Sequence, residues 1–512
     1  MSRLDKTVIP KKRNSRMHIP SQLYQPSLAL LTDLYQLTMA YGYWKSGFTQ
    51  KEAVFSLFFR AQPFQGGFSL ACGLAYVIDL LSTLTFTAED TAYLAELRGT
   101  DNTPLFDPAF LDYLQHIQFA CHVDAMPEGT VVFSHEPLIR VQGPLLQCQI
   151  IETALLNIIN FQTLIATKAA RMCLAAQGEP VLEFGLRRAQ GIDGALTASR
   201  AAYIGGCTAT SNVLAGKVFG IPVRGTHAHS WVMAFDDERE SFRAYAEAMP
   251  NNCIFLVDTY NTREGVRKAA EVGTWLKENG HTLLGIRLDS GDLGQLSIEA
   301  RTILDDAGFP DAAIVGGSDL DEYSITDLKE RGAPINLWGI GTKLVTAFDH
   351  PALGGVYKLN AIRDPAGPWQ YKLKLSDEEA KTTNPGILQV RRYQTDKEFL
   401  GDVMYDIEMG LVGGCTMVDQ TDSSQPQAIS DGTDFTDLLV PVFRAGKAVY
   451  EGPALTQIRQ RVQDQLHFLP PAVKLLRDPQ LYPVGLEQSL YTLKSQLVRQ
   501  ARERNVQEKE SP

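Results

Sequence analysis

Between residues 180 and 350, short apolar runs alternate with longer segments in which apolar residues recur at helical spacing. Each apolar run ends in polar or glycine-rich residues, as strands do where they open into loops. The six runs begin at Val181, Ile221, Ile254, Leu283, Ala312 and Leu337. Helix candidates lie between them, such as residues 262–280 and 294–310, which close on Gly280 and Gly308. Repeated strand–helix units predict an α/β fold with a parallel sheet, and this many in one segment favour a barrel.

The segments on either side lack this alternation. The N-terminal part mixes glycine, proline and aromatic residues with short alternating runs, for example in residues 53–61 and 129–143, which predicts a separate, mostly β domain. Beyond about residue 366, strand-like stretches occur near 388–393 and 448–450, and the chain ends in a segment typical of a solvent-facing helix. The predicted parts are a flexible basic tail at 1–20, the mostly β N-terminal domain at 21–150, the α/β barrel at 151–365 and a C-terminal segment at 366–512.

Composition and charge narrow the possible partners and the compartment. Hydrophobic residues make up 44% and charged residues 21% of the chain, values typical of soluble globular proteins. The net charge of −11 argues against a nucleic-acid-binding protein, so any phosphate site must be local. The seven cysteines are scattered without a C-x-x-C pair, which indicates reduced thiols in the cytoplasm. The longest apolar stretch, residues 145–176, contains charged and amide side chains, so we expect a buried helix rather than a membrane span.

Side chains that can contact a ligand gather at the ends of the apolar runs. They are Arg187, Thr226, His229, Asp258, Arg287, Asp289, Asp292, Ser318, Asp319 and Thr342. In α/β barrels the catalytic groups lie at the C-terminal ends of the strands. Serine, threonine and aspartate are also common helix N-caps, so any single aspartate could merely cap a helix. Taken as a set, these residues predict an active site at one edge of the sheet.

Two glycine-rich turns, at 316–318 and 339–342, follow the last two apolar runs, where backbone N–H groups and a helix N-terminus can hold a phosphate. A P-loop is excluded, because the Gly216-Lys217 pair is followed by valine. Arg287, Asp289 and Asp292 offer cation and anion chemistry in one short loop. That combination suits a substrate with phosphates and hydroxyls and a shared Mg²⁺.

The histidine pair His227 and His229 has two readings. An H-x-H pair on a strand presents both rings on one face, as a zinc site requires. Zinc needs a third protein ligand, however, and the other histidines are scattered with no nearby cysteine. A histidine at a strand end facing acidic residues is better placed as a nucleophile or a general base. A core histidine is the alternative without a catalytic role.

At these positions the sequence resembles the nicotinate phosphoribosyltransferase family, from about residue 28 to 360. The matching strings are LLTDLYQLTMAYGYW at Leu30, EFGLRRAQG at Glu183, TSNVLAG at Thr210, GTHAHSW at Gly225, LVDTYNT at Leu256, IRLDSGDL at Ile286, GSDLDE at Gly317 and GIGTKLVTAFDHPALGGVYKL at Gly339. The resemblance implies an irregular α/β barrel beside a mostly β domain built from the N- and C-terminal segments. It also implies a cytoplasmic homodimer with shared active sites.

The resemblance implies specific roles. His229 would be the phosphorylated histidine and Asp258 would orient it, while Arg287 and Asp289 would contact nicotinate and ribose. Gly317 and Thr342 would hold the 5-phosphate, and Thr226 would join them in substrate binding. Phe184 and Arg187 would cover the pyridine ring and bind anions, and Tyr35 would reach in from a second subunit. The substrates would be nicotinate, phosphoribosyl pyrophosphate and ATP, with Mg²⁺ held mainly by their phosphates. No role is assigned to His227.

Three other functions are weighed against this one. In nicotinamide phosphoribosyltransferases an acidic residue takes the position of Ser211, whereas Ser211 places no negative charge beside a carboxylate, which favours nicotinate. Quinolinate phosphoribosyltransferase would need more basic residues for a second carboxylate, and its chain is usually much shorter. A catalytically silent ligand-binding barrel is disfavoured because the matched polar residues are all present.

Overall fold

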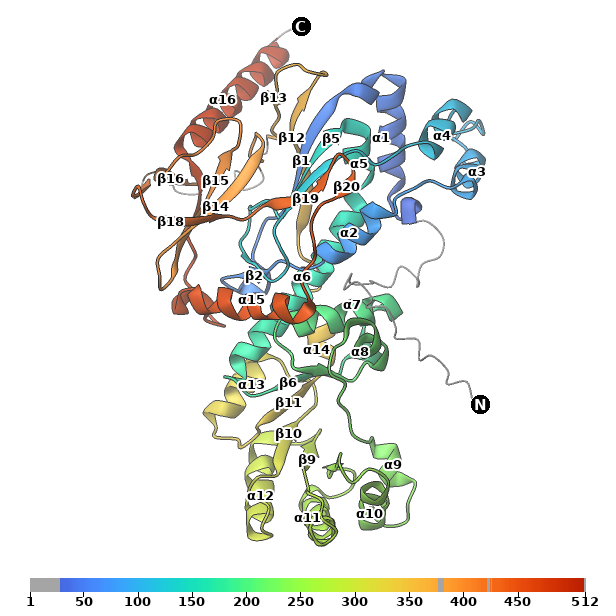
Figure 1. Cartoon of the computed structure of the whole chain (residues 1–512), viewed down its shortest axis with the longest axis vertical. Helices are drawn as coiled ribbons and strands as arrows, with labels where there is room; N and C mark the ends of the chain where they lie inside the picture. Colours follow the sequence, from blue (N-terminus) through green and yellow to red (C-terminus); the bar gives the residue numbers. More distant parts are fainter. Residues whose placement is uncertain (1–27, 376–381, 421–423, 425, 511–512) are drawn as a thin grey trace, which may run out of the picture.

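The computed structural model of the chain describes residues 28–375, 382–420, 424 and 426–510 (Figure 1). The predicted basic tail at 1–20 lies outside these residues. The chain forms two lobes: one contains two large β-sheets, and the other is built on a parallel sheet (Figure 1). Helix α6 (Glu152–Ala175) runs between them.

The parallel sheet confirms the predicted strand–helix alternation. Its six strands, in spatial order, are β7 (Ala209–Thr210), β6 (Val181–Glu183), β11 (Leu337–Ile340), β10 (Ala313–Gly316), β9 (Gly285–Leu288) and β8 (Ile254–Leu256). Five of the six apolar runs form these strands. The run from Ile221 makes only an isolated bridge between Val223 and Thr210. Pro222, which has no N–H to donate to a ladder, interrupts it. Within the described residues β7 and β8 are therefore edge strands, and the sheet is open.

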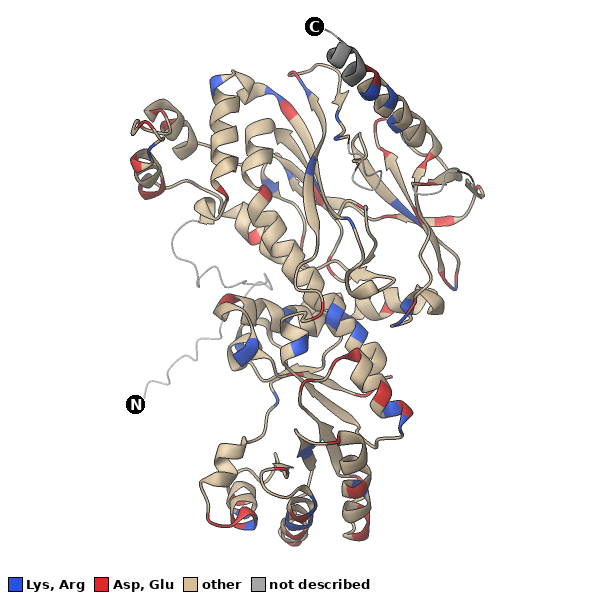
Figure 2. Ribbon diagram, turned by 180° about the vertical axis from the view of Figure 1, so that it is seen from behind, with Lys and Arg blue, Asp and Glu red and all other residues tan. Residues whose placement is uncertain are grey.

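Helices α11 (Thr262–Glu278), α12 (Leu293–Asp306) and α13 (Glu322–Glu330) follow β8, β9 and β10. Helices α11 and α12 pack against the sheet, α10 (Glu238–Ala248) packs against α11, and α13 packs against α6. Basic and acidic residues lie on the helices around the parallel sheet, whereas the strands of that sheet are largely uncharged (Figure 2). The chain leaves α11 and α12 through Gly280 and Gly308, both with positive φ, as the sequence predicted. The alternation of polar and apolar positions therefore separates a solvent face from a core face on each helix.

The other lobe is built from distant parts of the chain. A seven-stranded sheet has the order β13-β12-β1-β5-β3-β19-β20, with β13 (Gln370–Tyr371) and β20 (Lys447–Ala448) at its edges. Strand β1 (Glu52–Phe59) pairs antiparallel with β12 (Gly355–Arg363) and with the central strand β5 (Ile139–Pro144), and β3 (His122–Ala125) pairs with β19 (Val440–Arg444). A second, six-stranded sheet comes entirely from the C-terminal segment: β17 (Gln427–Ile429), β16 (Cys415–Asp419), β21 (Val484–Glu487), β15 (Phe399–Asp406), β14 (Leu388–Gln394) and β18 (Asp434–Asp437).

The description of residues 21–150 as mostly β needs correction. Within 28–150 the helices occupy more of the chain than the strands do. These helices are α1 (Leu34–Lys45), α2 (Leu74–Ser82), α3 (Ala88–Glu96), α4 (Pro108–Gln115) and α5 (Leu145–Ile150). They are short, and glycine, proline and aromatic residues within or beside them obscure the helical spacing.

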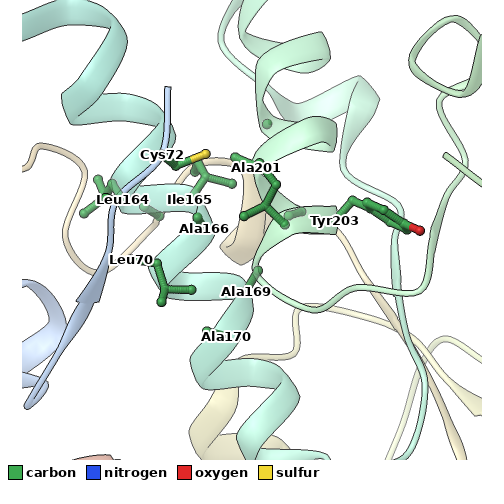
Figure 3. Close-up of a cluster of buried hydrophobic side chains, with 14 of the residues drawn as sticks. Leu70, Cys72, Leu164, Ile165, Ala166, Ala169, Ala170, Ala201 and Tyr203 are labelled. Atoms are coloured by element: carbon green, nitrogen blue, oxygen red, sulfur yellow. The ribbon is translucent and has the colours of Figure 1, made fainter. Parts of the chain in front are cut away.

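Helix α6 joins the two lobes through close packing. Its Ala166, Ala169 and Ala170 lie near Ala201 of α7 (Gly191–Ile204) in the buried cluster shown in Figure 3. Small side chains allow the two helices to approach closely. The apolar stretch 145–176 thus forms buried helices, α5 and α6, as predicted. Among the described residues, no helix is both long and apolar enough to cross a bilayer.

Candidate active site

The carboxyl ends of the parallel strands meet at one edge of the sheet, where most of the predicted site residues lie. The residues at this edge are Phe184 and Arg187 after β6, Ser211 after β7, Asp258 after β8, Arg287 on β9, Asp289 after it, Gly317 after β10 and Thr342 after β11. Thr226 and His229 lie in the connection that follows the Val223 bridge, and His229 is the first residue of α9 (His229–Met233). The topology therefore gathers groups that are far apart in sequence.

A hydrogen-bonded network ties the ends of β8, β9 and β10 together. Arg287 Nη2 donates to Asp289 Oδ1 at 2.8 Å, and the same oxygen accepts the Ser318 N–H at 3.0 Å. The Asp289 N–H and the Ser290 hydroxyl donate to Asp258 Oδ2 at 2.9 and 2.6 Å. Asp258 Oδ1 is buried without a hydrogen-bond partner in the described part of the chain. The network fixes the direction of the Arg287 guanidinium and leaves a buried carboxylate oxygen available to a ligand.

An aromatic ring lies next to this cation. The centre of the Phe184 ring is 5.8 Å from Arg287 Cζ, and the Phe184 N–H donates to the Ile340 carbonyl at 2.7 Å. A Cβ at Gly339 would lie 2.9 Å from the Phe184 ring, and a Cβ at Gly317 would overlap the Asp289 carboxylate. Glycine at these two positions therefore makes room for the ring and the acid. An aromatic face beside a guanidinium suits a flat, anionic ring.

His229 is held by Thr259. The sequence resemblance implied that Asp258 orients His229, but in the described part of the chain no hydrogen bond joins these two side chains. His229 Nδ1 lies 3.1 Å from Thr259 Oγ1, whereas the Asp258 carboxylate faces Asp289 and Ser290. Asp258 and Thr259 both lie beyond the end of β8, where the chain bends at Thr259, so the two side chains contact different neighbours. The sequence string alone does not show which of the two neighbours faces the histidine.

His227 is a core histidine. Its ring packs against Phe242, Tyr245 and Phe255, and its Nε2 accepts the Leu256 N–H at 3.3 Å. Burial outweighs the backbone hydrogen bond with Ala228, which acts in the opposite direction, and with a smaller contribution from the positive charge of Arg287 it lowers the pKa of His227 to about 4. The ring is therefore neutral near pH 7. In the described part of the chain, no group of three or more histidine, cysteine or acidic residues could hold a metal ion.

This burial predicts a pH dependence of stability. The ordinary histidine pKa of 6.5 applies to the unfolded chain, so between pH 6.5 and about 4 the unfolded state binds a proton that the folded state excludes. The stability contributed by neutral His227 is complete above pH 6.5 and is lost as the pH falls toward 4. In thermal melts from pH 7.5 to 4.5, the wild type should lose more melting temperature than His227→Gln, which keeps an acceptor but does not titrate. Parallel pH profiles would contradict this reading.

The remaining predicted residues differ in their position and in their exposure to solvent. Ser211 donates its N–H to the Glu183 carbonyl at 2.9 Å, and Thr342 opens α14 (Thr342–Val345) after Gly341. Arg187 is exposed, and Thr226 is half-buried. Tyr35 lies at the start of α1, in the other lobe, and is 49% exposed. No contact within the described part of the chain brings Tyr35 to the sheet edge.

Some features of the site were not predicted. Glu183 is buried at the end of β6 and accepts hydrogen bonds from Ser199 Oγ at 2.8 Å, Thr210 Oγ1 at 2.5 Å and the Gly185 N–H. A glutamate inside an apolar run was the available signal. Asp292, counted among the ligand-contacting groups, is the N-cap of α12, and its Oδ1 accepts the N–H groups of residues 294 and 295. For Asp292 the capping alternative was therefore correct.

Comparison with known proteins identifies the family of the chain. The profile of the nicotinate phosphoribosyltransferase (NAPRTase) N-terminal domain matches residues 30–160, and that of the nicotinate phosphoribosyltransferase C-terminal domain matches residues 389–494. The nicotinate phosphoribosyltransferase of Bacillus subtilis is 44% identical over 493 residues, which cover 94% of this chain and 98% of that protein. The Dictyostelium discoideum enzyme of the same name is 38% identical, with coverage of 85% and 82%.

Solved structures show the same relationship. The crystal structure of human nicotinic acid phosphoribosyltransferase matches with a TM-score of 0.80 and 34% identity, covering 91% of this chain and 99% of that one. Nicotinate-nucleotide pyrophosphorylase from Pyrococcus furiosus, at 21% identity and a TM-score of 0.65, shares the fold. Because the similarity spans nearly the whole chain at high identity, the chain belongs to the nicotinate phosphoribosyltransferase family.

Proposed function

We propose that the chain transfers the phosphoribosyl group of phosphoribosyl pyrophosphate to the ring nitrogen of nicotinate. The products are nicotinate mononucleotide and pyrophosphate, and the reaction is the first step of NAD salvage from nicotinate. The observation that carries the proposal is the Phe184 ring beside the Arg287 guanidinium, which is held by Asp289 at the edge of the sheet. The ring can cover the pyridine, and the guanidinium can bind the carboxylate.

The chemistry of the transfer assigns the other groups. The pyridine nitrogen attacks the anomeric carbon as pyrophosphate departs, so positive charge develops on the sugar and negative charge on the leaving group. We propose that Asp289 contacts the ribose and that Gly317 and Thr342, in the loops after the neighbouring strands β10 and β11, hold the 5-phosphate through their backbone. Arg187 and Thr226 lie at the same edge and complete the proposed substrate contacts.

Mg²⁺ and ATP enter the proposal as a metal cofactor and a co-substrate. The oxygen donors of Asp258 and Asp289 suit a hard cation, and the unpartnered Asp258 Oδ1 would be the protein ligand. We propose that substrate phosphates supply most of its ligands, and that when bound it neutralises charge on the departing pyrophosphate. ATP would phosphorylate His229 at Nε2, because Nδ1 faces Thr259. Coupling to ATP offsets the tendency of the pyridinium product to leave again.

The proposed quaternary arrangement and barrel follow from the same site. Exposed Tyr35 lies away from the sheet edge of its own chain, so in a homodimer it would cover the site of the partner. The segment that bridges β7 at Val223 lies where it would continue the parallel sheet toward closure as an irregular barrel. We place the enzyme in the cytoplasm, which its seven free cysteines support.

One assay tests the function directly. The purified chain is incubated with phosphoribosyl pyrophosphate, Mg²⁺ and either nicotinate or nicotinamide, with and without ATP, and the products are separated. We expect nicotinate mononucleotide, formed faster with ATP. A product formed only from nicotinamide would indicate the alternative transferase, and no product from either would indicate a silent binding barrel.

Ser211 should decide between the two pyridines. Its N–H is fixed to the Glu183 carbonyl, so its side chain has a defined position at the end of β7. In Ser211→Asp, two carboxylates face each other in a partly buried site, which costs on the order of a few kcal/mol. We expect kcat/KM for nicotinate to fall by about a hundredfold, while use of nicotinamide is spared. Ser211→Asn is the matched uncharged control. Unchanged preference for nicotinate in Ser211→Asp would remove Ser211 from the pyridine pocket.

A further inference from the structure

The two loops assigned to the 5-phosphate are joined by an ion pair. They follow β10 and β11, which are neighbouring parallel strands. Lys343, the residue after Thr342, places Nζ 2.6 Å from Oδ2 of Asp321, four residues after Gly317. The two side chains are only 29% and 18% exposed, so solvent screens the pair less than it would on an open surface. This ion pair therefore connects the two loops at the proposed phosphate end of the site.

Asp321 is itself held rigidly. It is the N-cap of α13: its Oδ1 accepts the Ser324 N–H at 2.8 Å, and the Ser324 hydroxyl accepts the Asp321 N–H at 2.8 Å. Burial works against ionisation of Asp321, but the hydrogen bonds from Lys343 and Ser324 outweigh it and hold its pKa below the usual value. One carboxylate oxygen thus caps the helix while the other holds Lys343.

The elements behind both loops are anchored to α6. Glu322, the first residue of α13, is fully buried; its Oε1 accepts Arg171 Nε at 2.7 Å, and its Oε2 lies 2.6 Å from Lys168 Nζ. Lys168 Nζ also lies 2.7 Å from Oδ1 of Asp349, just after α14. The helix that links the lobes therefore fixes the far side of both loops, and the Asp321–Lys343 pair fixes the near side.

We infer that the Asp321–Lys343 ion pair is a positioning device that sets the spacing of the two loops for the 5-phosphate of phosphoribosyl pyrophosphate. The inference rests on the proposed function. Lys343 acts through Asp321 and does not contact the phosphate, because its ammonium is already engaged by that carboxylate. Removing either Asp321 or Lys343 breaks the same ion pair, so both substitutions should have the same effect on the binding of phosphoribosyl pyrophosphate.

Four variants separate this role from direct phosphate binding. Lys343→Met removes the charge and keeps the stem, and Lys343→Arg restores a cation. Asp321→Asn loses the charge but retains a side chain that caps helices well. The double variant Asp321→Asn/Lys343→Met completes a cycle. Lys329→Met is the matched control, since it breaks an ion pair with Glu179 at the far end of the same helix.

Steady-state constants for both substrates and melting temperatures are measured for each variant. We expect the KM for phosphoribosyl pyrophosphate to rise about tenfold in both single variants, with the KM for nicotinate unchanged. Lys343→Arg and Lys329→Met should resemble the wild type. The double variant should be no worse than either single variant, as residues acting as one unit require.

Other outcomes overturn the inference. A much larger effect of Lys343→Met than of Asp321→Asn, with additive losses in the double variant, would make Lys343 a direct phosphate ligand. Equal rises in both KM values would indicate general damage to the site, and unchanged constants would show that the pair does not position the loops. If the wild type itself made no nicotinate mononucleotide, the proposed function would fail, which is a different result from all of these.

Discussion

Replacing His229 by alanine is expected to abolish nicotinate-dependent ATP hydrolysis and the incorporation of acid-labile phosphate into the protein. His229 is the histidine at the sheet edge whose ring is held at Nδ1 by a hydroxyl, with Nε2 left to receive the phosphoryl group. Some transfer without ATP should persist, because Arg287, Asp289 and the phosphate loops remain. The measurement is the release of ADP and of nicotinate mononucleotide, with and without ATP.

Two further variants give this prediction its controls. Thr259→Val keeps the shape of the threonine and removes its hydrogen bond to His229, so we expect slower phosphorylation rather than none. His227→Gln leaves His229 intact and should retain ATP stimulation. Full ATP stimulation in His229→Ala would contradict the phosphohistidine. A His229→Ala chain that fails to fold would instead identify a structural histidine.

The sequence predicted the strands of the catalytic sheet well because buried parallel strands are short apolar runs bounded by glycine and polar residues. The apolar run from Ile221 was predicted as a strand but does not form one, because Pro222 has no N–H to donate and the residues after it are exposed. The two-residue strand β7 was missed, because so short a strand carries no periodicity.

It was easier to predict which residues belong to the site than to predict which of them contact one another. Parallel topology alone brings Asp258, Asp289 and Gly317 to one edge. Which side chain faces which depends on the local rotation of the chain, and therefore Thr259 rather than Asp258 reaches His229. The capping role of Asp292 was equally hard to predict, because the sequence of an aspartate before a helix is compatible both with an N-cap and with a ligand-binding residue.

Ion pairs between side chains of separate helices and loops are harder still to predict from the sequence. Asp321 and Lys343 both stand inside strings that resemble the family, yet nothing in either string shows that they meet. Their contact depends on the order of β10 and β11 in the sheet and on the angle at which α13 leaves its strand. Lys168 and Glu322 illustrate the same point, since a charged residue within an apolar helix predicts a partner but not its identity.

Mixing two inactive variants should restore activity if the active sites are shared between subunits. Tyr35 is exposed in the lobe opposite Arg287, so we expect it to cover the pyridine site of the partner. Tyr35→Ala homodimers would lack the stacking lid, and Arg287→Ala homodimers would lack the cationic contact, so each should be poorly active. In a mixed dimer, the site on the Tyr35→Ala chain keeps its own Arg287 and receives an intact Tyr35.

Only that one site of the mixed dimer can work, because the other lacks both groups. An equal mixture of the two variants is unfolded and refolded. If the chains pair at random and the sites act independently, the mixture should recover about a quarter of wild-type activity. Differently tagged chains allow mixed dimers to be purified and counted, and each variant refolded alone is the control. Confirmed mixed dimers without recovered activity would mean that Tyr35 acts within its own chain or only packs in its lobe.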